Sequence, residues 1–231
     1  MSYPERPLSV QRTAPATYTL LVINAIMFGV LEAAGGSQNP FVLLKWGAKF
    51  APAIRAGEAW RLATSVFLHS GLLHLAANSY SLYNLGNVTE RLLGTRRFTI
   101  IYFLSGIWGS IISTYLSDPM VLGVGASGAI FGLAGCLFYF GVRYPKHFAV
   151  IAGSRFILVV LLNLIIGFTN PLIDNYAHIG GLFGGFVAAC AFGLPNDPRT
   201  ETRTLFCWLF IVATLIAIAM IARPLAPGNL M

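Results

Sequence analysis

The stretch GVGASGAIFGLAGCLFYFGV, residues 123–142, decides the fold class of this chain. It contains no charged residue, and Gly128 and Gly132 stand four positions apart within it. Small residues at this spacing lie on one face of a membrane helix and let a neighbouring backbone approach closely. We therefore expect a membrane helix over 127–142 that packs tightly against another helix.

A second stretch, AHIGGLFGG at residues 177–185, repeats the glycine spacing with Gly181 and Gly185. Because Gly181 follows His178 by three residues, the imidazole shares the face of the glycine strip. If the two strips pack together, Ser127 and His178 come within reach of each other.

The composition indicates a membrane protein. Hydrophobic residues make up 56% of the 231 residues, charged residues make up 10%, and the mean hydropathy is +0.72. Soluble globular chains are about 25% charged, and about 20 apolar residues cross a bilayer as a helix. We predict an all-α, polytopic bundle with seven spans, near 17–34, 70–87, 98–116, 127–142, 153–169, 177–194 and 204–222.

The positions of the 15 Lys and Arg residues predict the orientation. With the N-terminus in the cytoplasm, ten of them lie inside and five outside, which matches the positive-inside rule. The inner set is Arg6, Arg12, Arg91, Arg96, Arg97, Arg143, Lys146, Arg155, Arg199 and Arg203; the outer set is Lys45, Lys49, Arg55, Arg61 and Arg223. We expect the C-terminus outside. The net charge of +7 follows this pattern and not a basic face, so no nucleic-acid partner is expected.

The second predicted span is the least apolar, and polar groups in hydrocarbon are costly unless they face the bundle or a water-filled cavity. His74 and Asn78 are four residues apart and share one helix face, from which both can donate hydrogen bonds. His69 is expected to precede this helix, with Ser70 as its N-cap.

The spans that carry Ser127, His178 and His74 are all even-numbered, so they enter from the same side, and their polar residues fall in the first half of each helix. A serine becomes a useful nucleophile when a neighbouring base takes its proton. At a helix start, free backbone N–H groups and the positive dipole end favour developing negative charge. Gly123 and Gly125, which precede Ser127, let the chain turn tightly and approach closely.

The segment between the first two spans, roughly 35–69, is too polar to span and too apolar for an ordinary exposed loop. It holds Trp46 and Trp60 among several basic residues, a mixture that suits the membrane–water interface. We expect an interfacial element there.

The ordered set H-x4-H-x3-N, G-x-S-G and A-H-x-G-G-x-x-x-G resembles the signature of the rhomboid intramembrane serine proteases, over about residues 18–194. The resemblance implies a catalytic dyad of Ser127 and His178, with Asn78, His74 and the Ser127 backbone N–H as the oxyanion hole. Phe131 matches a position where that family has an aromatic residue packed on the catalytic histidine. The residues expected to support the site are Gly125, Gly128, Phe131, His69 and Gly181.

The resemblance also implies an organisation and an activity. We expect a cytoplasmic tail over 1–17, a six-span catalytic core over 18–194, and a connecting loop with an additional span over 195–231. The expected substrates are membrane proteins whose transmembrane helix unwinds easily, cleaved within the lipid bilayer. The expected location is a cell membrane, the bacterial cytoplasmic membrane in particular.

Other interpretations stay open at this point. A rhomboid-like protein without catalysis could bind membrane clients, although loss of the serine or histidine would be its mark. A transporter could line its path with the polar second helix, and Ser127 could be only a small packing residue. His69, His74 and His178 could bind zinc, yet the sequence contains no H-E-x-x-H motif. We expect neither a metal nor another cofactor.

Overall fold

The computed structural model describes residues 13–170, 173–193 and 200–222, and within these ranges the named elements are all helices. They are α1 (Pro15–Ala33), α2 (Pro40–Lys45), α3 (Ala51–Arg55), α4 (Arg61–Thr64), the 3-10 helix η1 (Ser65–Phe67), α5 (Leu72–Leu93), α6 (Thr95–Leu116), α7 (Ser127–Arg143), α8 (Pro145–Ile151), α9 (Gly153–Thr169), α10 (Asn175–Phe192) and α11 (Glu201–Ile221).

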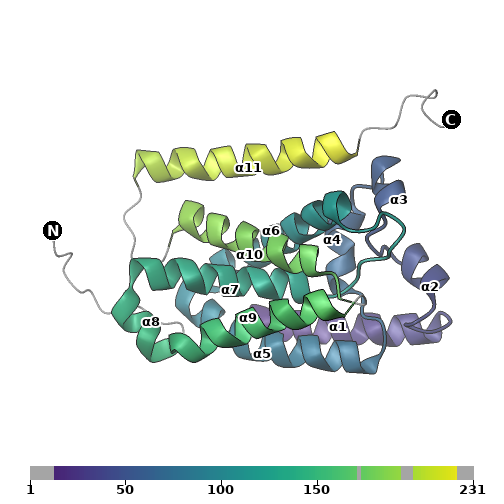
Figure 1. Ribbon diagram of the computed structural model, residues 1–231, viewed down its shortest axis with the longest axis horizontal. Helices are drawn as coiled ribbons and strands as arrows, with labels where there is room; N and C mark the ends of the chain where they lie inside the picture. Colours follow the sequence, from purple (N-terminus) through teal and green to yellow (C-terminus); the bar gives the residue numbers. More distant parts are fainter. Residues whose placement is uncertain (1–12, 171–172, 194–199, 223–231) are drawn as a thin grey trace.

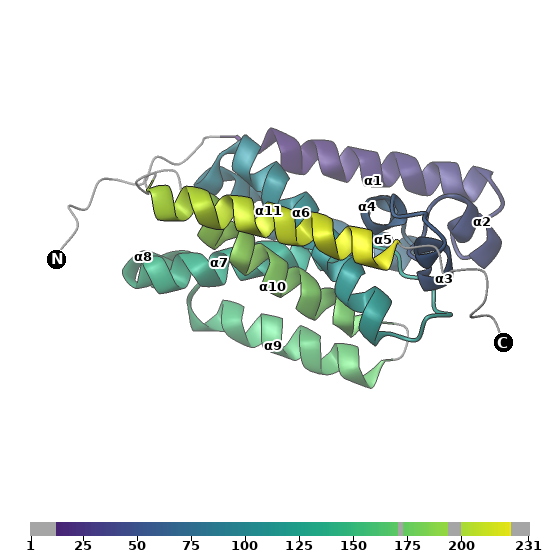
Figure 2. The same ribbon diagram turned by 90° about the horizontal axis from the view of Figure 1, so that it is seen from above.

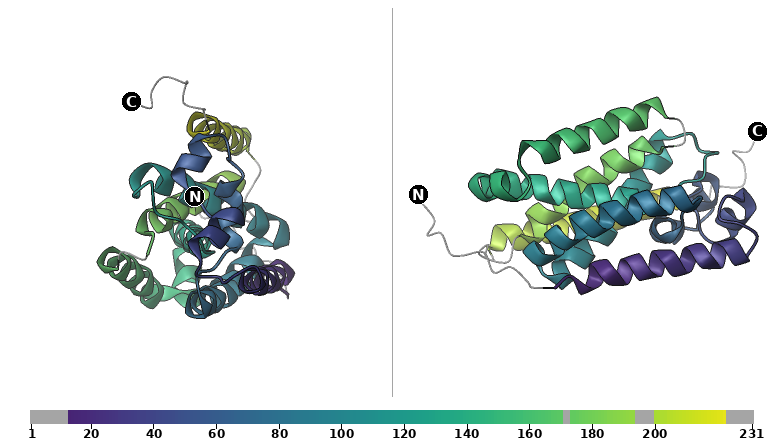
Figure 3. Two further views of the ribbon diagram at one scale, coloured as in Figure 1. Left: turned by 90° about the vertical axis from the view of Figure 1, so that its right-hand side faces the viewer. Right: turned by 90° about the horizontal axis from the view of Figure 1, so that it is seen from below.

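The long helices run side by side as one bundle (Figure 1). Helix α10 lies in its middle and packs most extensively against α7 and α6. Seen from above, α11 lies across one face of the bundle, with α1 and α9 along opposite edges (Figure 2). The end-on view places α11 opposite α5, α1 and α9 (Figure 3). The arrangement confirms the predicted helical bundle.

Glycines bring α7 and α10 into backbone contact. A side chain at Gly181 would overlap the carbonyl of Gly128, and one at Gly185 would overlap the carbonyl of Gly132. The two glycine strips, whose pairing the sequence left as a condition, are therefore in contact with each other. Since side chains are absent from this interface, the two helix starts are held at a separation set by backbone atoms.

Three described helices are long and apolar enough to cross a membrane by length and composition: α1, α6 and α11. A fourth is reached if α8 and α9 form one span that is bent by 73°. Helix α8 lies where the sequence predicted a loop, and Gly153, with φ of +62°, stands at the bend. The chain is a polytopic membrane protein, and the count of seven spans stays a prediction.

The segment over 35–69 folds into α2, α3, α4 and η1 at the end of the bundle where α5, α7 and α10 begin (Figure 1). Arg61 is 6% exposed and ties this segment together. Its guanidinium donates to the carbonyls of Leu44 at 2.6 Å and Ala48 at 3.2 Å, and it pairs with Glu58. The segment is therefore an ordered cap on that end, and its position at the membrane interface stays a prediction.

Glu90 fastens α1 to α5 at the opposite end. Its buried carboxylate accepts the backbone N–H groups of Ala16 at 2.9 Å and Thr17 at 2.7 Å. These are first-turn donors of α1, which have no partner inside the helix. The carboxylate thus satisfies the start of α1 and opposes the positive end of its dipole.

Candidate active site

Ser127 is the first residue of α7. The N–H of Ile130 donates to the carbonyl of Ala126 at 2.9 Å, so the N–H of Ser127 is one of the first-turn donors left without an intrahelical partner. Gly125 reaches this position with φ of +117°, which favours glycine, and its N–H donates to the carbonyl of Ser65 at 3.0 Å. The turn therefore presents a hydroxyl and a free N–H together.

His178 lies in the first turn of α10 and is 8% exposed. Asp174 caps this helix by accepting the N–H of Ala177 at 3.1 Å. The imidazole stacks on the ring of Phe131, with ring centroids 4.2 Å apart and 13° between the planes. Because Phe131 follows Ser127 by one turn of α7, the stacked pair holds the imidazole beside the start of that helix.

The backbone contacts of Gly128 place Ser127 next to His178. A side chain added at Gly128 would begin 3.3 Å from the carbonyl oxygen of Ala177, and Gly181, one turn further along α10, also contacts the backbone of Gly128. Among the described residues, no direct hydrogen bond joins Ser127 Oγ to His178. In unliganded enzymes such bonds are often long and tighten only when substrate binds.

His74 faces the serine from α5, and Asn78 lies one turn further along the same helix. A side chain added at Gly125 would begin 2.7 Å from His74 Nε2 and 3.8 Å from Ser127 Oγ, so both atoms border the same space. The N–H of Ser70 donates to His74 Nδ1 at 3.4 Å, which assigns the proton of the neutral ring to Nε2. Asn78 Nδ2 donates to the carbonyl of His74 at 3.0 Å and keeps a second N–H.

His69 precedes α5, as predicted, and is fully buried. Its ring meets the ring of His74 edge-on, with centroids 5.3 Å apart. Burial, and to a smaller extent repulsion from His74, lower the pKa of His69 to about 4. The expected N-cap at Ser70 is wrong: the helix starts at Leu72, and Gly71, with φ of +86°, occupies the cap position. This positive φ is strained for a residue with a side chain, so glycine is favoured at the cap position.

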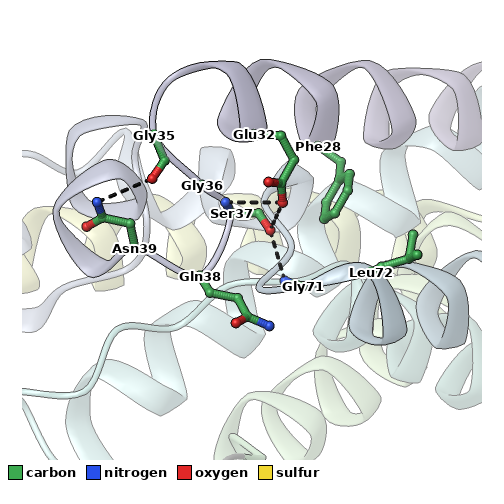
Figure 4. Close-up of a pocket in the computed structure, with 9 residues that line it drawn as sticks. All are labelled: Phe28, Glu32, Gly35, Gly36, Ser37, Gln38, Asn39, Gly71 and Leu72. Carbon is green, nitrogen blue, oxygen red and sulfur yellow. Dashed lines mark hydrogen bonds between the residues drawn. The ribbon is translucent and has the colours of Figure 1, made fainter.

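A cavity of about 540 Å³ lies between the end of α1 and the start of α5 (Figure 4). The hydroxyl of Ser37 donates to the Glu32 carboxylate and accepts the N–H of Gly71 at 3.2 Å. Neither Ser127 nor His178 lines this cavity. The hydrogen bonds of Ser37 nevertheless fix Gly71, which precedes α5 and lies three residues before His74.

A second cavity, of about 240 Å³, lies between α5, α7 and α9. Phe131, which stacks on His178, forms part of the cavity wall. Tyr80 of α5 and Val159 of α9 form other parts of the wall. The cavity therefore reaches from the side of the bundle to the ring that supports the candidate base.

The predicted site residues all gather at one end of the bundle, on the starts of α5, α7 and α10. Sequence reasoning missed Lys49 and Asp174, which pair beside the site at 3.5 Å. The available signals were an Asp four residues before His178 and a lysine in the apolar run of 46–54. Within the described part of the chain, His69, His74 and His178 form no group of three ligands suited to a metal.

Comparisons with known proteins identify the family and the relatives of this chain. A family model described as the Rhomboid domain matches residues 56–195. The chain is 43% identical to "Rhomboid protease GluP" of Bacillus subtilis over 195 residues, which are 84% of this chain and 38% of that protein. It is 39% identical to "RHOMBOID-like protein 5" of Arabidopsis thaliana over 150 residues, 62% of this chain and 47% of the relative. It is 31% identical to "Rhomboid-like protease 1" of Toxoplasma gondii over 185 residues, 78% of this chain and 61% of that protein. The chain thus spans between about two fifths and three fifths of the length of these relatives.

Proposed function

The chain belongs to the rhomboid family, and we propose that it is an intramembrane serine endopeptidase whose nucleophile is Ser127 and whose general base is His178. The observation that carries this proposal is the glycine-mediated contact of α7 and α10, which sets a helix-start serine beside a buried histidine. Relatives named as proteases support the reaction class.

The reaction follows from these two side chains. Ser127 Oγ attacks the carbonyl carbon of a peptide bond while its proton passes to His178, and the carbonyl π electrons move onto oxygen. The tetrahedral intermediate collapses, the C–N bond breaks, and His178 gives the proton to the leaving amine. Water then attacks the acyl ester with His178 again as base, which releases the acid and restores Ser127.

Three donors serve the oxyanion of each intermediate. They are the N–H of Ser127, the Nε2–H of His74 and the second N–H of Asn78. Donors that are held in place before reaction stabilise developing charge without reorganisation, and each contributes a large rate factor. The Nε2 tautomer of His74, assigned from its contact with Ser70, leaves that proton available to the oxyanion.

The substrate is proposed to be a membrane protein whose transmembrane helix unwinds easily. The cavity between α5 and α9 opens at the side of the bundle and has an apolar wall, so a segment could reach Ser127 from the lipid. A helical backbone has its carbonyls engaged in hydrogen bonds, so local unwinding must precede attack. Asn84 and Asn163, on opposite walls, can bond to the peptide groups that unwinding frees.

The charge bias of the loops supports a topology with the N-terminus in the cytoplasm and the active site opening to the outer side. The location that we propose is a bacterial cytoplasmic membrane. Water enters from the outer end, where α5, α7 and α10 begin.

The test uses purified protein in liposomes with a transmembrane peptide that carries a fluorophore and a quencher. Wild type is compared with Ser127→Ala and His178→Ala, and His147→Ala serves as the matched control. His147 is an exposed histidine on α8, at the far end of the bundle. We expect cleavage by wild type and His147→Ala and none by the two dyad variants.

Two outcomes would contradict the proposal. Cleavage that survives Ser127→Ala would assign the activity to another group. A folded wild type that cleaves none of several transmembrane substrates, yet binds them, would favour the non-catalytic client-binding interpretation.

A further inference from the structure

A buried lysine contacts both segments that lead to the proposed dyad, at Gly123 before Ser127 and at Asp174 before His178. Lys49, in the connection between α2 and α3, is 2% exposed. Its ammonium lies 3.5 Å from the Asp174 carboxylate and donates to Ser113 Oγ at 2.7 Å. A lysine is almost never this buried unless it is paired, so the contact calls for a specific explanation.

The backbone of Lys49 holds the segment that leads to Ser127. Its N–H donates to the carbonyl of Gly123 at 2.8 Å, and its carbonyl accepts the N–H of Gly123 at 2.9 Å. Ser127 follows Gly123 by four residues. Gly123 packs directly against the lysine side chain, because an added Cβ would lie 2.6 Å from Lys49 Cε and would displace it.

The side chain of Lys49 holds the helix that carries His178. Its partner Asp174 is the N-cap of α10, and His178 follows Asp174 by four residues. The same carboxylate accepts hydrogen bonds from Ser113 and, at 2.9 Å, from Ser117, both at the end of α6. One residue therefore contacts the serine segment through its backbone and the histidine helix through its ammonium.

We propose that Lys49, acting through Asp174, is a positioning residue that fixes the start of α10 relative to the Gly123–Ser127 segment, and so sets the separation of Ser127 and His178. The inference rests on the proposed function. Lys49 touches no reacting atom; it determines how often the serine hydroxyl and the imidazole are correctly aligned. A shift of about 1 Å between reacting groups can lower a rate on the order of 100-fold.

The test breaks the same link from both ends. Lys49→Met removes the ammonium and keeps the backbone pairing with Gly123. Asp174→Asn removes the charge and keeps an oxygen that can cap α10. The double variant removes both charges. Lys45→Met is the matched control, because Lys45 is an exposed lysine four residues earlier in the same segment.

Three quantities are measured for each variant: kcat and KM for the quenched substrate, the rate at which a fluorophosphonate labels Ser127, and the melting temperature in detergent. We expect both single variants and the double variant to share a similar loss of kcat and of labelling rate, on the order of 100-fold, with little change in KM. Lys45→Met should behave as wild type.

The melting temperatures of the variants should follow a different order from their kcat values. Asp174→Asn strands a buried ammonium and should melt lowest, whereas the double variant, which strands no charge, should recover stability. If kcat instead rises and falls with the melting temperature across the set, Lys49 acts through general stability and the proposal is wrong. An unchanged kcat and labelling rate in a folded Lys49→Met would overturn it as well.

Amide hydrogen exchange separates this proposal from the proposed function. If wild type neither cleaves nor is labelled, the protease proposal fails, and exchange still decides the role of Lys49. Faster exchange in both single variants, confined to 123–127 and the first turn of α10, supports the link. Exchange that matches wild type and Lys45→Met overturns it.

Discussion

The imidazole of His178 lies parallel to the ring of Phe131 at a centroid distance of 4.2 Å. An aromatic pair of this kind contributes about 0.5–1.5 kcal/mol beyond the area it buries. If this energy holds the imidazole in the position it needs for proton transfer, Phe131→Leu should lower kcat about 2- to 10-fold. Phe131→Tyr keeps the ring and should retain most of the activity. Equal kcat values for Leu and Tyr, measured with the quenched substrate, would show that the stack does not orient the base.

The proposed oxyanion donors predict a specific kinetic pattern. His74→Ala and Asn78→Ala should each lower kcat by about 10²–10³-fold with little effect on KM, because the oxyanion exists only beyond the ground state. Asn87→Ala is the control: Asn87 lies on the same helix and makes the same bond to the carbonyl four residues earlier as Asn78 does. A comparable loss in Asn87→Ala would attribute the effect to helix α5 as a whole.

The contact between α7 and α10 predicts opposite results for two glycine substitutions. Gly181→Ala would place a methyl group into the Gly128 carbonyl and should destabilise the protein by about 1–3 kcal/mol or more. Gly29→Ala, on the exposed face of α1 with no atom within 4 Å of the new methyl, should be neutral or stabilising by up to about 1 kcal/mol. Thermal unfolding in detergent measures both, and equal melting temperatures would contradict the packing argument.

The ion pair at the start of α10 predicts an acid dependence of stability. Burial alone would raise the pKa of Asp174, but the Lys49 ammonium and donors that include Ser113 outweigh it, so the pKa lies below its ordinary value of 3.8. A carboxyl whose folded pKa is lowered contributes stability above its unfolded pKa and loses it as the pH falls through the folded value.

The difference in melting temperature between wild type and Asp174→Asn should therefore stay constant from about pH 7 to about pH 5 and shrink toward about pH 3. Asp174→Asn has no carboxyl to titrate at this position, so acid should affect it less than wild type. A difference that stays the same down to about pH 3 would show that the carboxylate adds no stability.

Local patterns in the sequence were enough to predict much of the bundle. The glycine spacings of 128–132 and 181–185 identified two helix faces that permit close packing, because a surface without side chains lets a neighbouring backbone approach. Spacing of i, i+4 put His74 and Asn78 on one face, since it depends only on the pitch of a helix. The residues of the proposed dyad and oxyanion hole are therefore named by sequence, whereas Lys49 and Asp174 are not, and the catalytic roles stay predictions.

Contacts between distant segments were decided only by the tertiary structure. In the sequence, Lys49 is one of several basic residues of an expected interfacial segment. In the structure it pairs with the carboxylate of Asp174, 125 positions away, because the fold brings both residues to the same buried place. The tautomer of His74 depends on its contact with the N–H of Ser70. The 73° bend between α8 and α9 could not be predicted either, because Pro145 and Gly153 indicate where helices break but not the angle between them. Sequence determined which faces are apolar or small, because those properties belong to single helices; the partners of the buried polar groups depend on how several helices meet.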